Sequence, residues 1–451
     1  ITSPKKPKGH VEREILTLHV RNELPIRREQ WPVTSGVPFP KGALGSPENI
    51  RVLNPAGEEV PVQASVLGEW PDGSIKWLLV DFQADVEPKS ATEYRLEFGR
   101  KVLRRKEPKP RIFVTQKDSI VGVITGPLRL LFDADEPSFP GRVWMDLNGD
   151  DVFSAEEEIT APAALGVMEL INAAGKTYTS LKGPCRVEIE EKGPLRTVVR
   201  VVGEHQAEDG GKLFAYVMRI NAYAGKSFLK VFHTWENNRL DEDFTIIKSL
   251  MLKTPLRLKR PASTLLGEDG RVYRSSGEPV LSQNLDDEYT VGEGGIVKER
   301  GKRAKGLIDL SDGKWGLTVA VRDFWQNYPK SLGVEGDSII VGVCPPIPKD
   351  LYPPIAELED KLYYYLLNGE YKLKQGVSKT HELLYYFHKG DLKEARSMNY
   401  LGFLREPLLA ATPPEWYCDS KAFGDVAVAN RERFSDYEEN INKAFEDYLK
   451  N

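Results

Sequence analysis

Cysteine is scarce in this sequence of 451 residues, which contains only Cys185, Cys344 and Cys418. Three scattered cysteines are too few for the disulfide framework of a small secreted domain, and an odd number leaves at least one thiol unpaired. The sequence also lacks an apolar run long enough to cross a bilayer. These absences exclude a disulfide-stapled scaffold and predict that the chain has no membrane span.

A strong excess of positive or negative charge is missing as well. The 62 basic and 67 acidic residues leave a net charge of −5. Such a balance produces no global field that would recruit nucleic acid, so we expect no nucleic-acid partner. Local basic patches remain compatible with an acidic polysaccharide as a partner.

Turn-forming residues are plentiful, with 31 prolines and 38 glycines between segments rich in alternating Val, Ile and Thr. This pattern is typical of a mainly β protein. Short strands such as "ILTLHV" and "IKWLLVDF" predict a small β-barrel or sandwich over residues 11–108, and "RRKEPKPR" (104–111) predicts a linker.

Longer strands follow in the region 109–400. The most legible are "CRVEIEE", "LRTVVRVVGEHQ", "KLFAYVMRINAY" and "SFLKVFHTWE", separated by "KGP", "AEDGG" and "AGK". These separators are typical of hairpins, so the four strands should be antiparallel neighbours in one large sheet. A large sheet needs a second layer to bury one of its faces, which predicts a large antiparallel β-sandwich.

The two ends of the chain differ from the rest. Residues 1–10, "ITSPKKPKGH", predict a disordered basic arm, and the missing initiator methionine suggests removal of a leader or tag. We therefore expect an extracellular or cell-surface location. Residues 401–451 predict a helical segment in which one apolar stripe comprises Phe434, Tyr437, Ile441, Phe445 and Tyr448. We expect this stripe to dock on the sheets, on a further region of chain, or on a second copy in a homo-oligomer.

The stretch "DLNGDDVFSAEEE" (146–158) has the ligand order of an EF-hand calcium loop. The predicted ligands are the side chains of Asp146, Asn148, Asp150, Ser154 and Glu157 and the carbonyl of Val152. The alternative is an acidic surface turn, and Asp151 stands where such loops normally carry glycine. Because a strand-like segment precedes the loop, we expect a structural Ca²⁺ ion and not a helix–loop–helix switch.

Two stretches combine aromatic and planar polar side chains, which is how proteins bind sugars. "FHTWENN" (232–238) contributes His233, Glu236 and Asn237, and "VRDFWQNYPKSL" (321–332) contributes Arg322, Trp325, Gln326, Tyr328 and Lys330. For His233 a core position is an equal alternative, because it shares strand parity with Leu229 and Val231. Lys330 follows a proline on a predicted loop, where lysines are commonly exposed.

The motif "HELLY" (381–385) begins like the helix of a zinc protease. Tyr385 stands where the second histidine is required, however, and the surrounding "SKTHELLYYF" alternates like a strand. We therefore expect a strand here and no zinc site.

Several segments together resemble the rhamnogalacturonan exolyase and YetA-like family. The resemblance is carried by "TSGVPFPKGAL" (34–44), "PVQASVLGEWPDGSIKWLLVDF" (61–82), "RINAYAGKSFLKVFHTWENN" (219–238) and "DGKWGLTVAVRDFWQNYPKSL" (312–332). It implies an N-terminal RIFT-type β-barrel, a central β-sandwich, the start of an (α/α)₆ toroid, and action on the rhamnose/galacturonate backbone of pectin.

If the chain is a lyase of this type, the reaction is β-elimination at a uronate, which needs a carboxylate neutraliser, a base and an acid. Arg322 suits the first role, and Lys330, Tyr328 or His233 the others, with Trp325, Gln326, Asn237 and Glu236 as substrate contacts. A lysine base would need a pKa lowered by burial. The alternatives are a non-catalytic carbohydrate-binding or surface-assembly protein and a glycoside hydrolase, because fold does not fix function.

Overall fold

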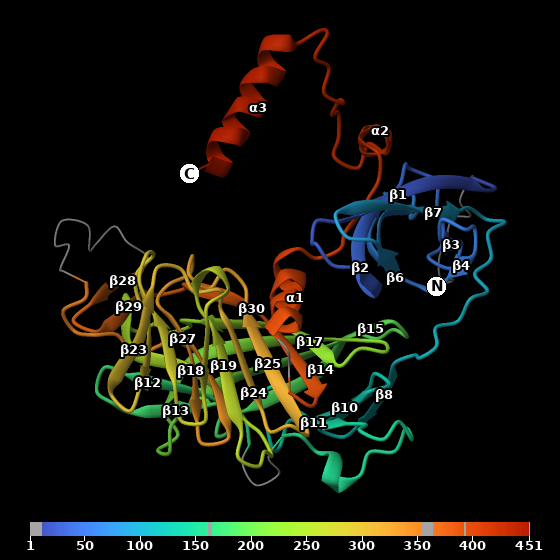
Figure 1. Ribbon diagram of the computed structural model, residues 1–451. Coiled ribbons are helices and arrows are strands. Elements are labelled where there is room, and N and C mark those ends of the chain that lie inside the picture. The colour runs from blue at the N-terminus through green and yellow to red at the C-terminus, as the bar shows by residue number, and fades with distance from the viewer. Residues whose placement is uncertain (1–10, 161–164, 353–363, 392–393, 451) are drawn as a thin grey trace. The chain divides into compact units, whose positions relative to one another are not determined.

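The computed structural model describes residues 11–160, 165–352, 364–391 and 394–450. The chain divides into two compact units (Figure 1). The first comprises the chain up to Glu107 together with Leu408–Asn451, and the second comprises Pro108–Pro407. The predicted basic arm at residues 1–10 lies outside the described residues. Among the described helices, none is both long and apolar enough to span a bilayer.

The first unit is a small β-barrel. Its elements are β1 (Glu14–Asn22), β2 (Arg28–Pro38), β3 (Ile50–Leu53), β4 (Glu59–Val60), β5 (Val62–Glu69), β6 (Ile75–Val86), β7 (Ser90–Phe98), β31 (Ala410–Ala411), α2 (Pro414–Asp419) and α3 (Ser435–Lys450). The strands form two sheets, ordered β31-β1-β7-β3-β4 and β2-β6-β5, around a common apolar core. The strand alternation in the sequence places Leu18, Phe82 and Leu96 inside this core.

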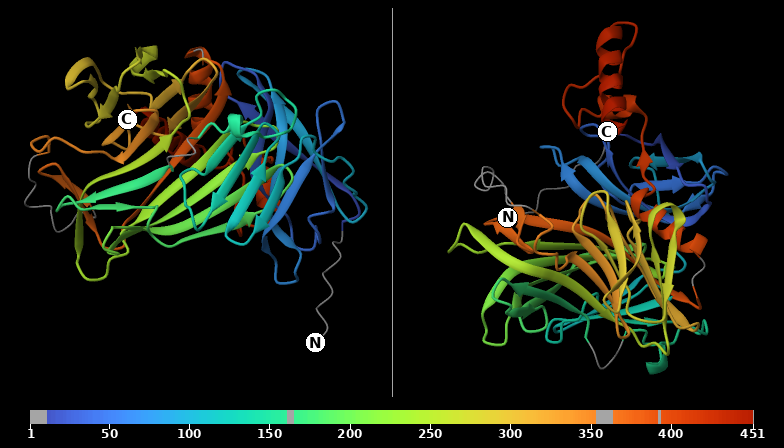
Figure 2. Two further views of the ribbon diagram at one scale, coloured as in Figure 1. Left: turned by 90° about the horizontal axis from the view of Figure 1, so that it is seen from below. Right: turned by 60° about the vertical axis from the view of Figure 1, so that its left-hand side comes forward.

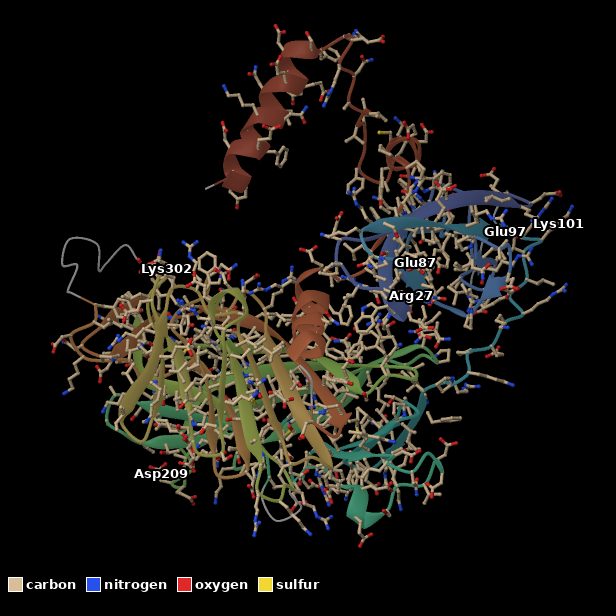
Figure 3. All side chains as sticks on the ribbon, in the orientation of Figure 1. Arg27, Glu87, Glu97, Lys101, Asp209 and Lys302 are labelled. Atoms are coloured by element: carbon tan, nitrogen blue, oxygen red, sulfur yellow. The ribbon has the colours of Figure 1, made fainter. Side chains whose placement is uncertain are left out.

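Charged and aromatic contacts complete the barrel. Arg27 forms an ion pair of 3.2 Å with Glu87, and both are labelled with Glu97 in Figure 3. Glu97 is buried and accepts hydrogen bonds from two arginines. The returning C-terminal segment packs Trp416 of α2 on the core, where its Nε1 donates to the carbonyl of Pro38 at 2.7 Å. Four residues of the predicted apolar stripe are exposed, Tyr448 the most at 81%, and Ile441 is partly buried.

The second unit is a large antiparallel β-sandwich with a small sheet ordered β11-β10-β9-β8 before it. Its early elements are β8 (Phe113–Lys117), β9 (Ile120–Ile124), β10 (Leu128–Asp133), β11 (Arg142–Met145), η1 (Ala155–Glu157), β12 (Val167–Asn172), β13 (Thr177–Thr179), β14 (Cys185–Glu191), β15 (Arg196–Gln206), β16 (Lys212–Tyr223), β17 (Phe228–Glu236) and β18 (Phe244–Pro255). The later ones are β19 (Ala262–Leu266), η2 (Glu268–Gly270), β20 (Val272–Ser275), β21 (Val280–Gln283), β22 (Tyr289–Glu293), β23 (Ile296–Gly301), β24 (Leu307–Ser311), β25 (Trp315–Val321), β26 (Lys330–Glu335), β27 (Ser338–Cys344), β28 (Tyr364–Leu367), β29 (Glu370–Lys374), β30 (Ser378–Lys389) and α1 (Glu394–Arg405).

Strand pairing resolves the sandwich into two layers. Layer A is ordered β14-β15-β16-β17-β30-β25-β24-β19-β20. Layer B is ordered β12-β18-β27-β26-β21-β22-β23. The strands β15, β16 and β17, green in Figure 2, run side by side. Val231 and Leu383 of layer A and Leu252 and Val341 of layer B belong to one apolar core, so each layer buries its inner face against the other.

The outer face of layer A is partly covered by a helix and carries charged side chains. Helix α1 contacts β24, β25 and β30, and its Tyr400 stacks on Tyr386 of β30 with 3.7 Å between ring centroids. Beyond the helix, this face carries charged side chains. The fold is therefore mainly β, as predicted, and the partly covered outer face of layer A is where polar groups gather.

Candidate functional site

The candidate site is a cluster of two cations around Glu382 on the outer face of layer A. Glu382 lies on β30, Lys230 on the neighbouring β17, and Arg322 directly after β25. The Arg322 backbone N–H donates to the Glu382 carbonyl at 3.0 Å, which extends the β25–β30 pairing by one residue. The Glu382 carboxylate then receives Arg322 Nη1 at 3.0 Å and Lys230 Nζ at 2.5 Å. Two cations thus share this carboxylate, and Asp323 Oδ2 lies 3.6 Å from Arg322 Nε.

An aromatic ring adjoins this cluster. Phe232 is the cross-strand partner of Glu382 and lies on the same face of the sheet. The ammonium of Lys230 lies 5.1 Å from the centre of the Phe232 ring. The side chains of Arg322 and Lys230 keep 35% and 23% of their surface exposed, so a ligand can still reach both. A half-exposed ring beside two cations suits a charged sugar.

The turn after β25 presents most of the residues predicted from "VRDFWQNYPKSL". Phe324 is fully buried and anchors the turn, and Gly306 has no room for a side chain because an added Cβ would lie 2.3 Å from Phe324 Cβ. Trp325 is half-buried under the guanidinium of Arg303, 4.1 Å from its ring centre. Gln326 and Tyr328 are exposed. The structure therefore brings these three predicted residues together with Arg322.

Lys330 does not lie on an exposed loop. It opens β26, is only 5% exposed, and its Nζ donates to the carbonyls of Pro329 at 3.0 Å and Val343 at 2.8 Å. Burial lowers the pKa of Lys330 to about 8. The lowered pKa that a lysine base requires is present, but the burial that produces it turns the amine away from solvent.

His233 occupies the core position that strand parity allowed. Its side chain is fully buried on the inner face of layer A, and its ring centroid lies 6.2 Å from that of His381, its cross-strand partner. Burial lowers the pKa of His233 to about 3, so the ring is neutral near pH 7. His233 and the Arg322 cluster thus lie on opposite faces of the same layer.

The two other predicted residues of "FHTWENN", Asn237 and Glu236, lie in different environments. Asn237 is fully buried, and its amide donates to the carbonyls of Leu373 and Lys374 at 3.1 and 3.2 Å, which ties the end of β17 to β29. Glu236 is exposed at the last position of β17. The contacts of Asn237 are those of a side chain that fixes two backbone segments.

The predicted calcium loop turns tightly around its acidic side chains. Asp146 is buried and accepts backbone N–H bonds from Gly149 at 2.6 Å and Asp151 at 3.1 Å. Glu157 accepts from the backbone of Leu147 and Ser154, both at 3.0 Å, and these bonds lower its pKa. Asp151 adopts the positive φ of 59° that glycine normally supplies at this position.

The donor set of this loop fits a calcium ion chemically. Each carboxylate has about four lone-pair sites, so the backbone bonds leave Asp146 and Glu157 further acceptor capacity. Among the described residues, no group of three His, Cys, Asp or Glu side chains is arranged to hold a metal by itself. Three of the six predicted ligands are the amide of Asn148, the hydroxyl of Ser154 and the carbonyl of Val152, and calcium accepts all three.

Glu382 and Lys230 are the site residues that the sequence reasoning missed. The strand predicted over "SKTHELLYYF" is confirmed as part of β30. Its alternation puts Glu382 on the face opposite His381, and the alternation of "SFLKVFHTWE" puts Lys230 opposite Val231. That signal identifies outward-facing charges, but the sequence does not show which strands are neighbours.

Two family models match the sequence. The PcRGLX-like N-terminal RIFT barrel domain matches residues 22–97, and the PcRGLX-like central β-sandwich domain matches residues 156–264 and 280–342. Together the matches cover more than half of the chain. They coincide with the barrel of the first unit and with the sandwich of the second.

Individual relatives are distant. The "Uncharacterized protein YetA" of Bacillus subtilis (strain 168) is 22% identical over 93% of this chain and 55% of its own length. A solved structure of a protein in the Glycosyl Hydrolase Family 38 from Enterococcus faecalis has a TM-score of 0.54 at 12% identity, over 88% of this chain and 47% of that chain. The second likeness is one of fold. The chain spans about half the length of these relatives.

Proposed function

Because this chain belongs to the family of PcRGLX-like proteins, whose N-terminal barrel and central β-sandwich it contains, we propose that it is a carbohydrate-active protein. Its proposed substrate is an acidic polysaccharide of the rhamnogalacturonan type, and the proposed reaction is β-elimination at a galacturonate. The observation that carries the proposal is the pair of partly exposed cations, Arg322 and Lys230, on either side of the Glu382 carboxylate.

In this proposal the cations bind the uronate carboxylate. Abstraction of the proton at C5 builds negative charge on that carboxylate, and a guanidinium stabilises the charge through two parallel hydrogen bonds. Arg322 is the proposed neutraliser. Glu382 holds Arg322 and Lys230 at fixed positions before substrate arrives, which lowers the entropy cost of binding. Phe232 offers an apolar surface to the sugar ring.

A proton must leave C5 and another must reach the departing glycosidic oxygen. Of the three predicted acid or base groups, Tyr328 is 36% exposed, whereas Lys330 and His233 lie inside the sandwich. We therefore assign proton transfer to Tyr328, on the same turn as Arg322: its phenolate accepts the C5 proton, and the phenol so formed donates that proton to the departing glycosidic oxygen. Trp325 and Gln326 on this turn are the proposed sugar contacts.

The test is ultraviolet absorbance of unsaturated uronate during incubation of the 451-residue chain with rhamnogalacturonan. Absorbance should rise with the wild type and fall at least about tenfold in rate with Arg322→Gln, because a charge-assisted hydrogen bond is lost. Arg186→Gln is the matched control, since Arg186 is an exposed arginine paired with Glu188 elsewhere in the sandwich. No rise from a folded chain would overturn the assignment of elimination to these two units.

The burial of Lys330 and His233 favours a second candidate function, which is carbohydrate binding without cleavage. A binder needs the cations and rings of the outer face but no base. Retained binding of acidic oligosaccharides in the absence of unsaturated product would support this alternative.

A further inference from the structure

Helix α1 brings another arginine to the Arg322 turn. Arg405 is the last residue of α1, and its Nη2 donates to the Lys305 carbonyl at 3.2 Å. The next carbonyl along the chain, that of Gly306, accepts from the Val321 backbone N–H at 2.8 Å, and Arg322 follows directly. These bonds place the Arg405 guanidinium beside the turn that carries Arg322. In Figure 1 the helix lies against β30 and β25.

The guanidinium of Arg405 has an unused donor. Its Nε is buried and has no hydrogen-bond partner among the described residues. A buried donor without an acceptor destabilises the free protein, so a ligand whose acceptor reaches this nitrogen recovers that loss. Burial lowers the pKa of Arg405; Asp323 and Glu406 oppose that shift, and the charge of Arg322 adds to it. Arg405 therefore lies within electrostatic reach of both residues.

Cations and carboxylates lie close together around this corner. Asp323 Oδ2 lies 3.6 Å from Arg322 Nε, and Glu382 is shared with Lys230. Glu406, the residue after Arg405, is a third carboxylate that acts on Arg405. Arg322 and Arg405 carry like charges, which repel, and an anion placed between the two guanidinium groups relieves that repulsion.

We propose that Arg405 and Arg322 form a two-arginine clamp that selects the carboxylate of a uronate, with Arg405 as the specificity-determining residue. This inference rests on the proposed function for its substrate class and adds a residue from the helix that covers layer A. Planar guanidinium groups match the two oxygens of a carboxylate, whereas a neutral sugar offers hydroxyl groups alone. The clamp therefore distinguishes uronates from neutral sugars.

The experiment is calorimetric binding of two oligosaccharides to the full chain. One is a rhamnogalacturonan oligosaccharide, and the other is the same compound with its carboxyl groups reduced to alcohols. The wild type should bind the acidic compound more tightly. Arg405→Gln should weaken binding of the acidic compound by roughly tenfold or more, while binding of the reduced compound changes little.

Two further variants keep this test interpretable. Arg405→Lys should restore part of the preference for the acidic compound, since it keeps the charge without the planar fork. Arg186→Gln should leave the preference intact. Melting curves establish that each variant is folded. The clamp is overturned if the wild type binds both compounds equally or neither of them, or if folded Arg405→Gln keeps the full preference.

The outcome of this binding experiment does not depend on whether the chain catalyses elimination. An Arg405-dependent preference for the acidic compound, measured with a chain that releases no unsaturated uronate, supports the clamp and overturns the elimination chemistry. Loss of product formation in Arg405→Gln with unchanged binding overturns the clamp as a specificity device.

Discussion

The imidazole of His388 lies between two oxygen acceptors, with Nε2 2.9 Å from Asp309 Oδ1 and Nδ1 2.9 Å from the Gly390 carbonyl. A ring with a hydrogen on each nitrogen would donate to both oxygens and form an ion pair with the Asp309 carboxylate. Both side chains are buried, at 3% and 2% exposure. Thr318 and Ser311 also donate to the carboxylate. This pair joins β24 to β30 on the outer face of layer A.

Removal of one partner of this pair should destabilise the sandwich. We expect His388→Gln to lower the free energy of unfolding by about 3 kcal/mol, because the Asp309 carboxylate stays buried with its charge uncompensated. Urea denaturation measures the difference. Thr318→Val is the control for loss of one neutral donor and should cost only about 1 kcal/mol. Equal effects of the two substitutions would show that the pair is not ionic.

Acid should destabilise the second unit through its core histidines. Burial lowers the pKa of His233 to about 3 and that of His205 to about 4, from an ordinary value of 6.5, and lowers that of His381 as well. Below pH 6.5 the unfolded chain binds protons that the folded chain excludes, so the free energy of unfolding falls as the pH drops. Between pH 6.5 and its own lowered pKa, each histidine contributes about 1.4 kcal/mol per pH unit to this loss of stability.

Urea midpoints measured between pH 6.5 and about pH 5 test this expectation. His233→Leu should make the loss of stability shallower than in the wild type. His19→Gln should not, because His19 lies on the barrel with 44% of its side chain exposed. An unchanged slope in folded His233→Leu would contradict the assignment of this acid sensitivity to the core.

Lys330 should make the stability of the fold depend on pH in the alkaline range. Its pKa of about 8 lies below the ordinary value of 10.5, so between these values the unfolded chain holds a proton that the folded chain has lost. Stability should therefore fall as the pH drops from 10.5 toward 8 and then level off. Lys330→Met should remove this dependence in denaturation curves and, because Tyr328 is the proposed proton-transfer group, should retain elimination. Loss of elimination in a stable Lys330→Met variant would restore Lys330 as the base.

Local sequence signals predicted the strands well. The predicted segments 185–191 and 212–223 coincide with β14 and β16, and 195–206 and 227–236 begin one residue before β15 and β17. The reason is that hairpin turns and two-residue alternation are properties of neighbouring residues. For His233, the sequence was compatible with a core position and with a ligand contact. Packing between the two layers places its side chain on the inner face of layer A.

The candidate site was only partly predictable because its members are far apart in the chain. Arg322, Trp325, Gln326 and Tyr328 share one turn, so their neighbourhood followed from the sequence alone. Glu382 is separated from Arg322 by 60 residues, and their contact depends on the register of β25 and β30. Arg405 is 100 residues from Lys305, and its position depends on where α1 packs. Such pairings arise from tertiary structure and leave no local pattern.

The loop at 146–157 yields a prediction that depends on an ion. We expect added Ca²⁺ to raise the melting temperature of the protein, because a ligand that binds the folded state alone stabilises it by mass action. Asp146→Ala should abolish the increase. Asp146 is the first ligand in the predicted order, and its carboxylate is also the acceptor for the backbone N–H groups of Gly149 and Asp151.

Glu156→Ala provides the matched control for charge. Glu156 is an exposed acid in the same loop and precedes the predicted ligand Glu157, so its removal lowers the negative charge without removing a ligand. Asp146→Ala also loses two backbone hydrogen bonds, and the baseline without calcium separates that cost from the response to the ion. A calcium response that survives in Asp146→Ala would place the ion elsewhere. No response in the wild type at saturating calcium would identify residues 146–158 as an acidic turn closed by its own backbone hydrogen bonds.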